Sequence, residues 1–383
     1  MERLLRISAT LTPNTTSRQV VESTPLEVRY LKAPKLGDQY ILKKVIGFRP
    51  QRRVAPNLSV EKRDDKVIAH NYGHGGSGWT LAPGSAAHIL DLLEQFSPEL
   101  KKDTPITIIG AGVIGLFTAY LAIERGYKNL TIVSEAFDNL TSHVAGGLLA
   151  PIMLDGSPEF VKMISKIGLD AYTFYKGVSE GRNPILAGGA EIVPAYFKDR
   201  ESSGLEPYVP GVMKPAKDVI VDFGNGTQRQ MVVYDDGIFM HTQKTMKLLQ
   251  AYLKDKVKHV QKKVYKFNEL SGKYIINCTG LGARELNGDN AMLPVQGHLI
   301  MLKDQDAKDL KYMVMSPIEY SKNKHGQKLK RSFYFFPKQD LGAAEREIGL
   351  VGGTFVEGAG EETLNEEEFE IVLKNAREFV GEY

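Results

Sequence analysis

Cysteine is almost absent from this sequence. Cys278 is the single one among 383 residues, so the chain cannot form an internal disulfide, and cysteine-rich zinc or iron–sulfur sites are excluded. Net charge is also scarce: the formal value of +3 provides no dominant field for the phosphates of a nucleic acid. The basic run at residues 322–331 is best explained as a solvated loop. Apolar residues at 42% and charged residues at 25% match a folded globular protein.

Long apolar runs are equally few. Charges at Glu2, Arg3 and Arg6 interrupt the N-terminal segment, so we expect no secretory signal and a cytoplasmic protein. Residues 106–123 carry no charge over 18 positions, which is the lower limit for a membrane span. Glycines crowd the first half of this run and would weaken a spanning helix. A buried strand, a glycine turn and a helix explain the run better, so we expect neither membrane nor nucleic acid as a partner.

The glycine turn in this run has the context of a nucleotide-binding motif. Residues 110–115 read Gly-Ala-Gly-Val-Ile-Gly, which fits the G-x-G-x-x-G fingerprint. An expected strand at 106–109 precedes the turn and an expected helix at 114–125 follows it. The fingerprint requires this strand–turn–helix context, so the sequence predicts dinucleotide binding.

Each glycine of the fingerprint has its own task. Gly110 permits the tight turn, Gly112 lets the backbone approach a pyrophosphate, and Gly115 lets the helix pack on the strand. The free N–H groups and the positive end of the helix dipole then hold the phosphates. Glu135 follows the next expected strand, at 130–134, where a carboxylate can accept hydrogen bonds from both ribose hydroxyls.

Further segments resemble the FAD-dependent D-amino-acid oxidase family. Residues 47–50, Gly-Phe-Arg-Pro, resemble its substrate-arginine segment, and residues 70–80 closely resemble its glycine-rich loop over the flavin ring. Residues 141–151 look like its flavin-contacting segment, and residues 274–280 like its later FAD-domain strand. Residues 261–267 resemble the stretch whose backbone meets the adenine.

The order of these segments is unusual for that family. In the family the fingerprint opens the chain, whereas the Gly-Phe-Arg-Pro segment and the glycine-rich loop close it. Here those closing motifs stand at 47–80, ahead of the fingerprint, and residues 373–377 resemble what normally precedes them. The sequence therefore predicts a circular permutation in which the polar stretch 97–105 joins the old ends.

The resemblance implies an α/β fold with two domains: a Rossmann-type FAD-binding domain and a mainly antiparallel β-sheet substrate domain, circularly permuted. The permuted motifs would belong to the FAD-binding domain. The expected division is an N-terminal arm at residues 1–40, FAD-binding segments at 41–151 and 241–295, substrate-domain segments at 152–240 and 296–345, and an FAD-domain strand with the C-terminal helix at 346–383.

The resemblance also implies FAD as the cofactor. The glycine loop would place backbone N–H groups near the pyrimidine edge of the flavin, as a preorganised anion site, whereas residues 147–148 would face flavin N5. Besides the three fingerprint glycines and Glu135, the expected FAD-binding residues are Gly75, Gly78, Trp79, Thr80, Val113, Ile114, Ala136, Ser142, Gly147, Leu148, Val264, Thr279 and Gly280.

Three residues are candidates for handling an amino acid. The planar fork of Arg49 fits a carboxylate bidentately, and Tyr334 aligns with a family tyrosine that contacts the same carboxylate. Gly76 would offer its carbonyl to the substrate amine. Each candidate has a simpler structural interpretation: a solvated arginine beside Arg52 and Arg53, a tyrosine of an aromatic core, and an ordinary turn.

The activity that the resemblance implies is oxidative deamination of a small amino acid, a D-amino acid or a glycine-like amine. Hydride would pass from the α-carbon to flavin N5, and O2 would reoxidise the flavin, giving H2O2 and an imino acid. The alternatives are an FAD dehydrogenase with another acceptor and a flavin-binding protein without turnover. The amino acid and O2 are the expected partners, and a homodimer stays open.

Two positions depart from the family pattern. Lys330 stands where a second active-site tyrosine is expected, four residues before Tyr334; it either points to solvent or meets an acidic side chain of the substrate. Ala150 replaces a polar residue. These changes leave the substrate side chain and stereochemistry open. We expect no metal site, because His70 and His74 have no further ligand at a suitable spacing.

Overall fold

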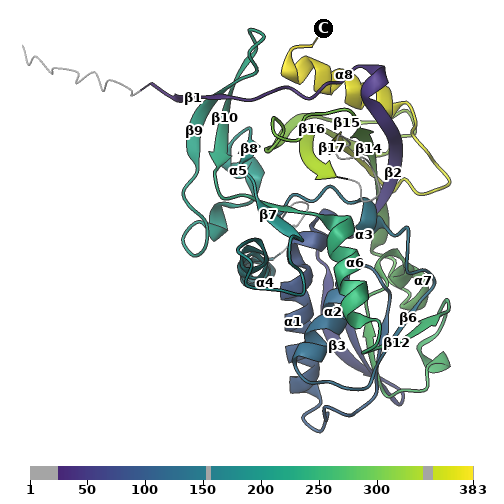
Figure 1. Cartoon of the computed structure of the whole chain (residues 1–383). Helices are drawn as coiled ribbons and strands as arrows, with labels where there is room; N and C mark the ends of the chain where they lie inside the picture. Colours follow the sequence, from purple (N-terminus) through teal and green to yellow (C-terminus); the bar gives the residue numbers. More distant parts are fainter. Residues whose placement is uncertain (1–24, 152–156, 340–347, 383) are drawn as a thin grey trace, which may run out of the picture.

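The computed structural model describes residues 25–151, 157–339 and 348–382. Their strands form a six-stranded sheet, a nine-stranded sheet and a small two-stranded sheet. Figure 1 shows the six-stranded sheet at the bottom of the molecule and the nine-stranded sheet at the top. This arrangement agrees with the expected α/β fold of two sheet-centred parts.

The six-stranded sheet is the nucleotide-binding type that the fingerprint predicts. All its neighbouring strands are parallel except the β3–β4 hairpin, which is antiparallel. The parallel strands are short and largely apolar, as expected for strands covered on both faces. In spatial order the strands are β12 (Lys258–Gln261), β6 (Leu130–Ser134), β5 (Ile106–Ile109), β13 (Tyr274–Asn277), β4 (Lys66–Tyr72) and β3 (Asn57–Arg63).

Long helices pack beside this sheet. They are α1 (Gly78–Phe96), α2 (Val113–Glu124), α4 (Pro158–Ser179) and α6 (Thr242–Leu253). α2 is apolar on nearly every side because α1 and α6 both pack against it. The uncharged run at residues 106–123 is therefore β5, the glycine turn and α2. Within the described ranges, no helix is long and apolar enough to cross a membrane.

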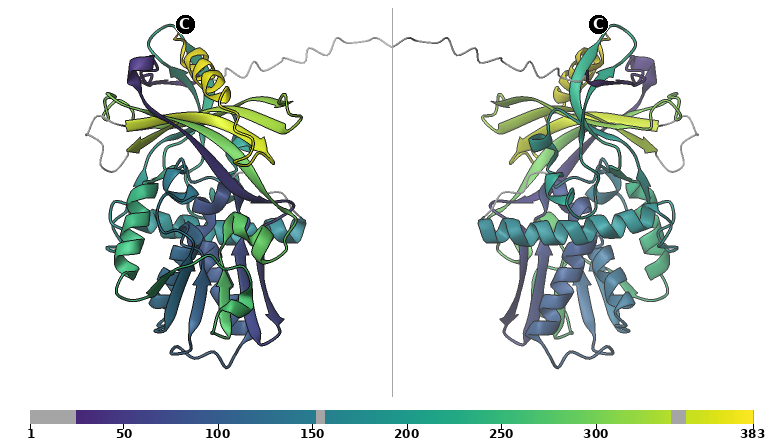
Figure 2. Two further views of the ribbon diagram at one scale, coloured as in Figure 1. Left: turned by 90° about the vertical axis from the view of Figure 1, so that its right-hand side faces the viewer. Right: turned by 90° about the vertical axis from the view of Figure 1, so that its left-hand side faces the viewer.

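The nine-stranded sheet is mainly antiparallel, as predicted, with parallel pairing only at β1–β9 and β8–β15. Helix α8 (Glu368–Val380) covers its outer face (Figures 1 and 2). In spatial order the strands are β1 (Glu27–Tyr30), β9 (Lys217–Asp222), β10 (Gln228–Tyr234), β8 (Ala195–Phe197), β15 (Met313–Lys322), β16 (Lys328–Gln339), β17 (Ile348–Glu357), β14 (Met292–Leu302) and β2 (Ile41–Arg52).

The other elements are short. They are the helices α3 (Thr141–Val144), α5 (Arg200–Ser203) and α7 (Ala283–Leu286), the paired strands β7 (Ala190–Ile192) and β11 (Ile238–Met240), and the 3₁₀ turns Asp38–Tyr40, Gly75–Ser77, Glu206–Tyr208, Phe267–Glu269 and Gly280–Gly282.

Alternation along β16 gives the nine-stranded sheet two different buried faces. Phe333 and Phe335 pack into the cluster under α8, whereas Tyr334 and Phe336 belong to the larger cluster on the opposite side. Successive side chains of a strand point to opposite faces, so one aromatic run serves both layers. The second face, which carries Tyr334, is the one turned toward the six-stranded sheet (Figure 2).

The sheets differ from the expected domain division in three places. β2 lies within the predicted FAD-binding segment 41–151, yet it pairs with β14 of the nine-stranded sheet along nearly its whole length, from Arg52 opposite Met292 to Ile41 opposite Leu302. β17 and α8 also belong to this sheet, not to the nucleotide-binding part. β1, within the predicted arm, pairs with β9. The other boundaries stay predictions.

Helix α8 and the start of β2 lie against each other. The Arg377 side chain donates to Leu36 O at 2.8 Å and contacts Asp38 at 3.1 Å, and Lys44 pairs with Glu370 at 2.7 Å. Leu36 is fully buried in the cluster under α8. These contacts hold α8 close to the start of β2, which is where the permutation hypothesis places the interrupted connection. We therefore propose that the chain is circularly permuted.

Reversing the permutation would join the end of α8 to the segment before β2, and both of these segments contact the turn after β9. Leu31 N donates to Asp222 O at 3.0 Å, and the side chain of Asn225 donates to Val380 O at 2.8 Å, so both ends contact one turn. At the other junction, residues 97–105 lie at the surface apart from the Ser97 side chain, which is buried. The chain can therefore be cut there without opening a core.

A rearranged chain tests this proposal. It starts at Pro105, runs to Tyr383 and continues through a short linker into residues 31–96. We expect it to fold and retain FAD, because loop-closure entropy rises only slowly with linker length. Flavin absorbance of the purified protein and its thermal melting are the measurements. Colourless or insoluble protein from several linker lengths would contradict the permutation.

Candidate functional site

Two adjoining cavities open beside the carboxyl ends of the parallel strands. The outer cavity, about 390 Å³, lies at the ends of β5, β6 and β13. The inner cavity, about 200 Å³, reaches from there to the nine-stranded sheet. They meet because six residues line both: Pro50, Gly112, Thr141, Ser142, Cys278 and Gly280. The result is one channel at the strand ends, where open α/β sheets bind their ligands.

The fingerprint turn forms the middle of this channel. Gly110 has a φ of +106°, and a Cβ there would lie 2.5 Å from Cys278 O. A Cβ on Gly115 would lie 2.0 Å from Gly110 O, so this glycine allows α2 to pack on the strand and does not itself line a cavity. Helix α2 begins without a side-chain cap from Gly112. The first N–H group of the helix, that of Val113, donates to Ser142 Oγ at 2.9 Å, so the next N–H group of this turn is the one available to an anion in the channel.

The outer cavity contains the residues expected near the adenine and ribose. Exposed Glu135 and half-buried Ala136 follow β6, and Val264 and Thr279 line the same space. The turn after β6 is fixed by Ser134, whose hydroxyl donates to Ala136 O at 2.7 Å. The predicted ribose acceptor Glu135 therefore lines this cavity, and its role stays a prediction.

Charged residues that the sequence analysis did not single out also line the outer cavity. Lys263 lies 3.4 Å from Glu285, and the charges of Glu285 and then Glu135 raise the pKa of this lysine. Lys262 lines the wall as well. The two lysines lie within the 261–267 stretch, whereas Glu285 comes from a separate segment that the fold brings beside them.

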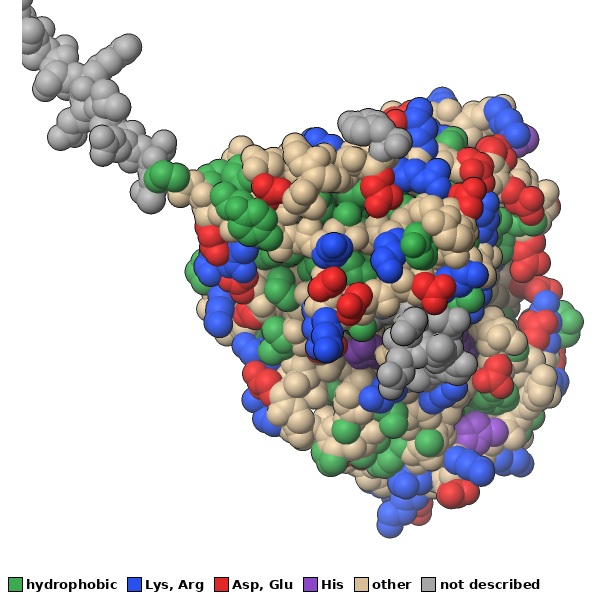
Figure 3. All heavy atoms as spheres, turned by 45° about the horizontal axis from the view of Figure 1, so that its top comes forward, with side chains coloured by type: hydrophobic (Ala, Val, Ile, Leu, Met, Phe, Trp, Pro, Cys, Tyr) green, Lys and Arg blue, Asp and Glu red, His purple; other side chains and the backbone are tan. Residues whose placement is uncertain are grey.

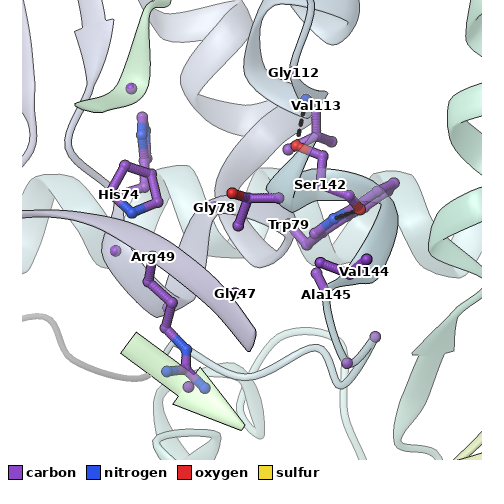
Figure 4. Close-up of a pocket in the computed structure, with 18 of the residues that line it drawn as sticks. Gly47, Arg49, His74, Gly78, Trp79, Gly112, Val113, Ser142, Val144 and Ala145 are labelled. Atoms are coloured by element: carbon purple, nitrogen blue, oxygen red, sulfur yellow. Dashed lines mark hydrogen bonds between the residues drawn. The ribbon is translucent and has the colours of Figure 1, made fainter. Parts of the chain in front are cut away.

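A second helix begins at the inner cavity. After β4 the chain turns through Gly73 and Gly75, with φ values of +91° and +56°, and α1 starts at Gly78. Ser77 gives this helix no side-chain cap, so the first N–H groups of α1 also face the channel. The Trp79 indole donates to Ser142 O at 3.0 Å and fixes this start against the segment after β6 (Figure 4).

Nearly all the expected site residues line the channel. The inner cavity holds Gly75, Gly76, Gly78, Trp79, Val113, Ile114, Gly147 and Leu148, together with Arg49 and Tyr334. Besides Gly115, the exception is Thr80. Its buried hydroxyl donates to Ala150 O at 2.9 Å and accepts from Ala150 N at 3.1 Å. Thr80 therefore fixes the segment at Ala150 and lines neither cavity.

Arg49 and Tyr334 meet at the wall of the inner cavity. The Arg49 guanidinium lies 4.2 Å from the centre of the Phe355 ring and donates to Thr354 O at 3.0 Å. Burial lowers the pKa of Arg49, and a hydrogen bond with Tyr334 opposes that shift. Burial likewise raises the pKa of Tyr334, with Arg49 acting against it. An arginine stays protonated in such surroundings.

Two glycines make room for this pair. A Cβ on Gly297 of β14 would lie 2.4 Å from Arg49 Nη1, and a Cβ on Gly352 of β17 would lie 2.5 Å from the Tyr334 ring. Larger residues at either position would displace the guanidinium or the phenol. The sequence analysis missed both glycines, because strand pairing alone brings them under these side chains.

The inner cavity is otherwise neutral and largely apolar. No carboxylate stands among its described lining residues, whereas Leu299, Met315, Phe336 and Phe355 do. The buried Nε2 of His74 has no hydrogen-bond partner within the described part of the chain. Burial lowers the pKa of His74 to about 4, so this side chain is neutral at physiological pH and offers one free ring nitrogen to a ligand.

The channel offers the kind of donors that hold FAD. Two helix N-termini face it, each after a glycine turn, and at α2 the Val113 N–H is bound by Ser142 Oγ. Within the described residues, no group of three or more His, Cys, Asp or Glu side chains is suited to a metal ion. The fold and channel thus define an FAD-binding oxidoreductase.

The comparison with protein families gives the same class. The family model described as FAD dependent oxidoreductase (DAO) matches residues 105–382. The chain belongs to this family, and its cofactor is FAD. The match begins at the end of the 97–105 stretch, so the motifs at 47–80 lie outside it.

Individual relatives are more distant. The chain is 26% identical over 219 residues to the D-amino-acid oxidase of Dictyostelium discoideum and 26% identical over 214 residues to the D-aspartate oxidase of Homo sapiens. These matches cover 54% and 52% of this chain, and the chain spans only 59% of each relative's length. Glycine oxidase from Bacillus cereus has a similar fold, with a TM-score of 0.51 and 15% identity over 72% of this chain and 77% of that one.

Gly112→Val tests the channel. A Cβ at this position would already lie 3.3 Å from Ser142 Oγ, so a branched side chain would fill the junction of the two cavities. We expect the purified variant to contain no flavin and to show no flavin absorbance after reconstitution. Gly272→Val is the matched control, because a Cβ there meets nothing closer than 3.5 Å. A yellow Gly112→Val protein would remove this turn from the cofactor site.

The neutral state of His74 predicts a pH dependence of stability. Between its lowered pKa of about 4 and the ordinary value of about 6.5, the unfolded chain binds the proton and the folded chain does not. The free energy of unfolding should therefore fall as pH drops through this window, by up to about 1.4 kcal/mol per pH unit for this group. His74→Gln should flatten the dependence in denaturant titrations, whereas exposed His325→Gln should not. If the free energy of unfolding falls equally steeply with pH in both variants, the neutral state of His74 is not the cause of the dependence.

Proposed function

We propose that the protein oxidises the α-carbon–nitrogen bond of an amino acid with FAD, and that O2 accepts the electrons. The observation that supports this proposal is that the charge of Arg49 is not paired with a carboxylate. Among the described residues this partly buried, desolvated cation has no carboxylate partner, although a charge withdrawn from water is costly unless it is paired. An anionic ligand in the cavity would supply the missing charge.

The substrate carboxylate is the natural ligand for this wall. The guanidinium fork can accept it bidentately, and the Tyr334 hydroxyl beside it can add one donor. The carbonyl of Gly76, which lines the same cavity, can accept a hydrogen bond from the substrate amine. These contacts fix both polar groups of the α-carbon and leave its hydrogen to face the cofactor.

Bound FAD supplies the acceptor for the hydrogen and electron pair of the α-carbon. The first residues of α1 line the inner cavity, and their N–H groups would stabilise negative charge that develops on a cofactor held there, as preorganised donors do without rearrangement. The apolar lining excludes water from the reacting atoms and strengthens these electrostatic contacts. The amine loses one proton, so the product is an imino acid, which water converts to a 2-oxo acid and ammonium.

O2 would take up two electrons and two protons to give H2O2. The names of the curated relatives, both oxidases, support this acceptor. Oxygen uptake during turnover, halved by catalase, is the measurement that distinguishes this acceptor from an artificial dye. Turnover with the dye alone would favour a dehydrogenase instead. A flavin that no amino acid bleaches without oxygen would overturn the enzyme proposal.

Arg49→Ala is the direct test of substrate capture. The variant should retain FAD but lose at least about tenfold to a hundredfold in kcat/KM, because a hydrogen bond to a charged group is worth about 1.5–3 kcal/mol. Arg49→Lys should recover only part of the loss, since a point charge cannot reproduce the fork. Arg53→Ala is the control, because its side chain is 65% exposed. Unchanged kinetics in Arg49→Ala would remove this residue from the site.

A further inference from the structure

Lys330 stands at the edge of the inner cavity. On β16 it pairs across the strands with Phe355 of β17 and Tyr320 of β15, and cross-strand partners share one face of a sheet. Phe355 lines the inner cavity, so Lys330 projects from the cavity face of the sheet and not from the face under α8. The ammonium lies 5.7 Å from the centre of the Phe355 ring and 5.2 Å from that of Tyr320.

The same Phe355 ring relates Lys330 to Arg49. The Arg49 guanidinium carbon is 4.2 Å from the ring centre and the Lys330 ammonium is 5.7 Å from it. The two cationic groups can therefore be no farther apart than 9.9 Å, the sum of these distances. In an ion pair the nitrogen and the carboxylate oxygen lie within about 4 Å of each other. A small molecule with two carboxylates a few ångströms apart can thus bridge the two cations.

The charges around Lys330 are paired, but Lys330 itself is not. Lys328 lies 3.8 Å from Glu357, Lys324 lies 3.0 Å from Glu367, and Arg331 binds Glu368 and Glu319. Basic and acidic side chains are accordingly interspersed on the face that Figure 3 shows. In the described part of the chain, Lys330 forms no ion pair and contacts aromatic rings instead.

We propose that Lys330 binds the side-chain carboxylate of a dicarboxylic amino acid whose α-carboxylate is held by Arg49. This inference rests on the proposed function, because it places the α-carbon at the FAD. The described lining of the inner cavity contains Arg49 and no carboxylate, and Lys330 lies against Phe355 of that lining, which favours a doubly anionic ligand. One or two methylenes between the α-carbon and the second carboxylate give the required reach.

Binding and turnover test the proposal separately. The first probe is glutarate against butyrate, followed as a perturbation of the flavin absorbance of the full-length FAD-bound protein. The second is anaerobic flavin reduction by aspartate and glutamate against asparagine and glutamine, with both enantiomers of each. We expect the dicarboxylates to bind and react at least about tenfold better than their neutral counterparts, the range of one charge-assisted hydrogen bond.

Lys330→Met should remove this preference. It keeps the length of the side chain and its packing on the rings but not its charge. We expect glutarate affinity and kcat/KM for the acidic amino acid to fall about tenfold to a hundredfold, with little change for the amides. Lys328→Met, two residues nearer the hairpin tip, is the matched control and should keep the wild-type preference.

The outcomes separate the two proposals. A preference for neutral amino acids, or one that survives in Lys330→Met, would overturn the role of Lys330 and leave the oxidase activity standing. Reduction by no amino acid, with glutarate still bound through Lys330, would overturn the oxidase activity and keep the dicarboxylate site. Equal binding of glutarate and butyrate would overturn the dicarboxylate site whatever the turnover.

Discussion

The site depends on a charged guanidinium, that of Arg49, which is partly buried at the cavity wall without a carboxylate partner in the described chain. That condition requires a strand of the nine-stranded sheet to reach the glycine loop. β2 does this, because Arg49 pairs with Val295 of β14 and Gln51, two residues on, pairs with His74. It also requires empty space beneath the side chains, which Gly297 and Gly352 provide. Strand pairing, glycine placement and the aromatic face of Phe355 all serve to hold one cation where a ligand must neutralise it.

Local chemistry explains which parts of the structure could be predicted from the sequence. Gly110 and Gly115 are dictated by contacts within a few residues of the turn and by the neighbouring strand end, so the fingerprint identifies them. Thr80 shows where a motif is insufficient, because the resemblance predicts a flavin contact for this residue, whereas its hydroxyl is bonded to Ala150. The sheet to which β2 belongs depends on pairing with a distant strand, and no pattern within β2 reveals that partner.

For this fold, the order of the segments along the chain matters less than which segments lie side by side in space. The channel needs α1 beside α2, and β4 and β5 on the two sides of β13. The connection from α1 to β5 is a surface stretch that carries no site residue. Likewise, the segment before β2 lies along α8 whether or not a peptide bond joins them, because Leu36 and Arg377 make that contact through side chains and a carbonyl. Sheets are specified by pairing and burial, so the same site can form from segments in either order.

The electrostatics of the channel change along its length. At the outer end lysines and glutamates compensate one another, whereas the inner end combines Arg49 and the start of α1 with no carboxylate in its described lining. His74 adds no charge at physiological pH, since burial holds its pKa at about 4. The inner cavity therefore keeps an unmet positive charge until an anion enters. A ligand that supplies it relieves the cost of burying that charge, so cofactor and substrate binding both stabilise the fold that creates their site.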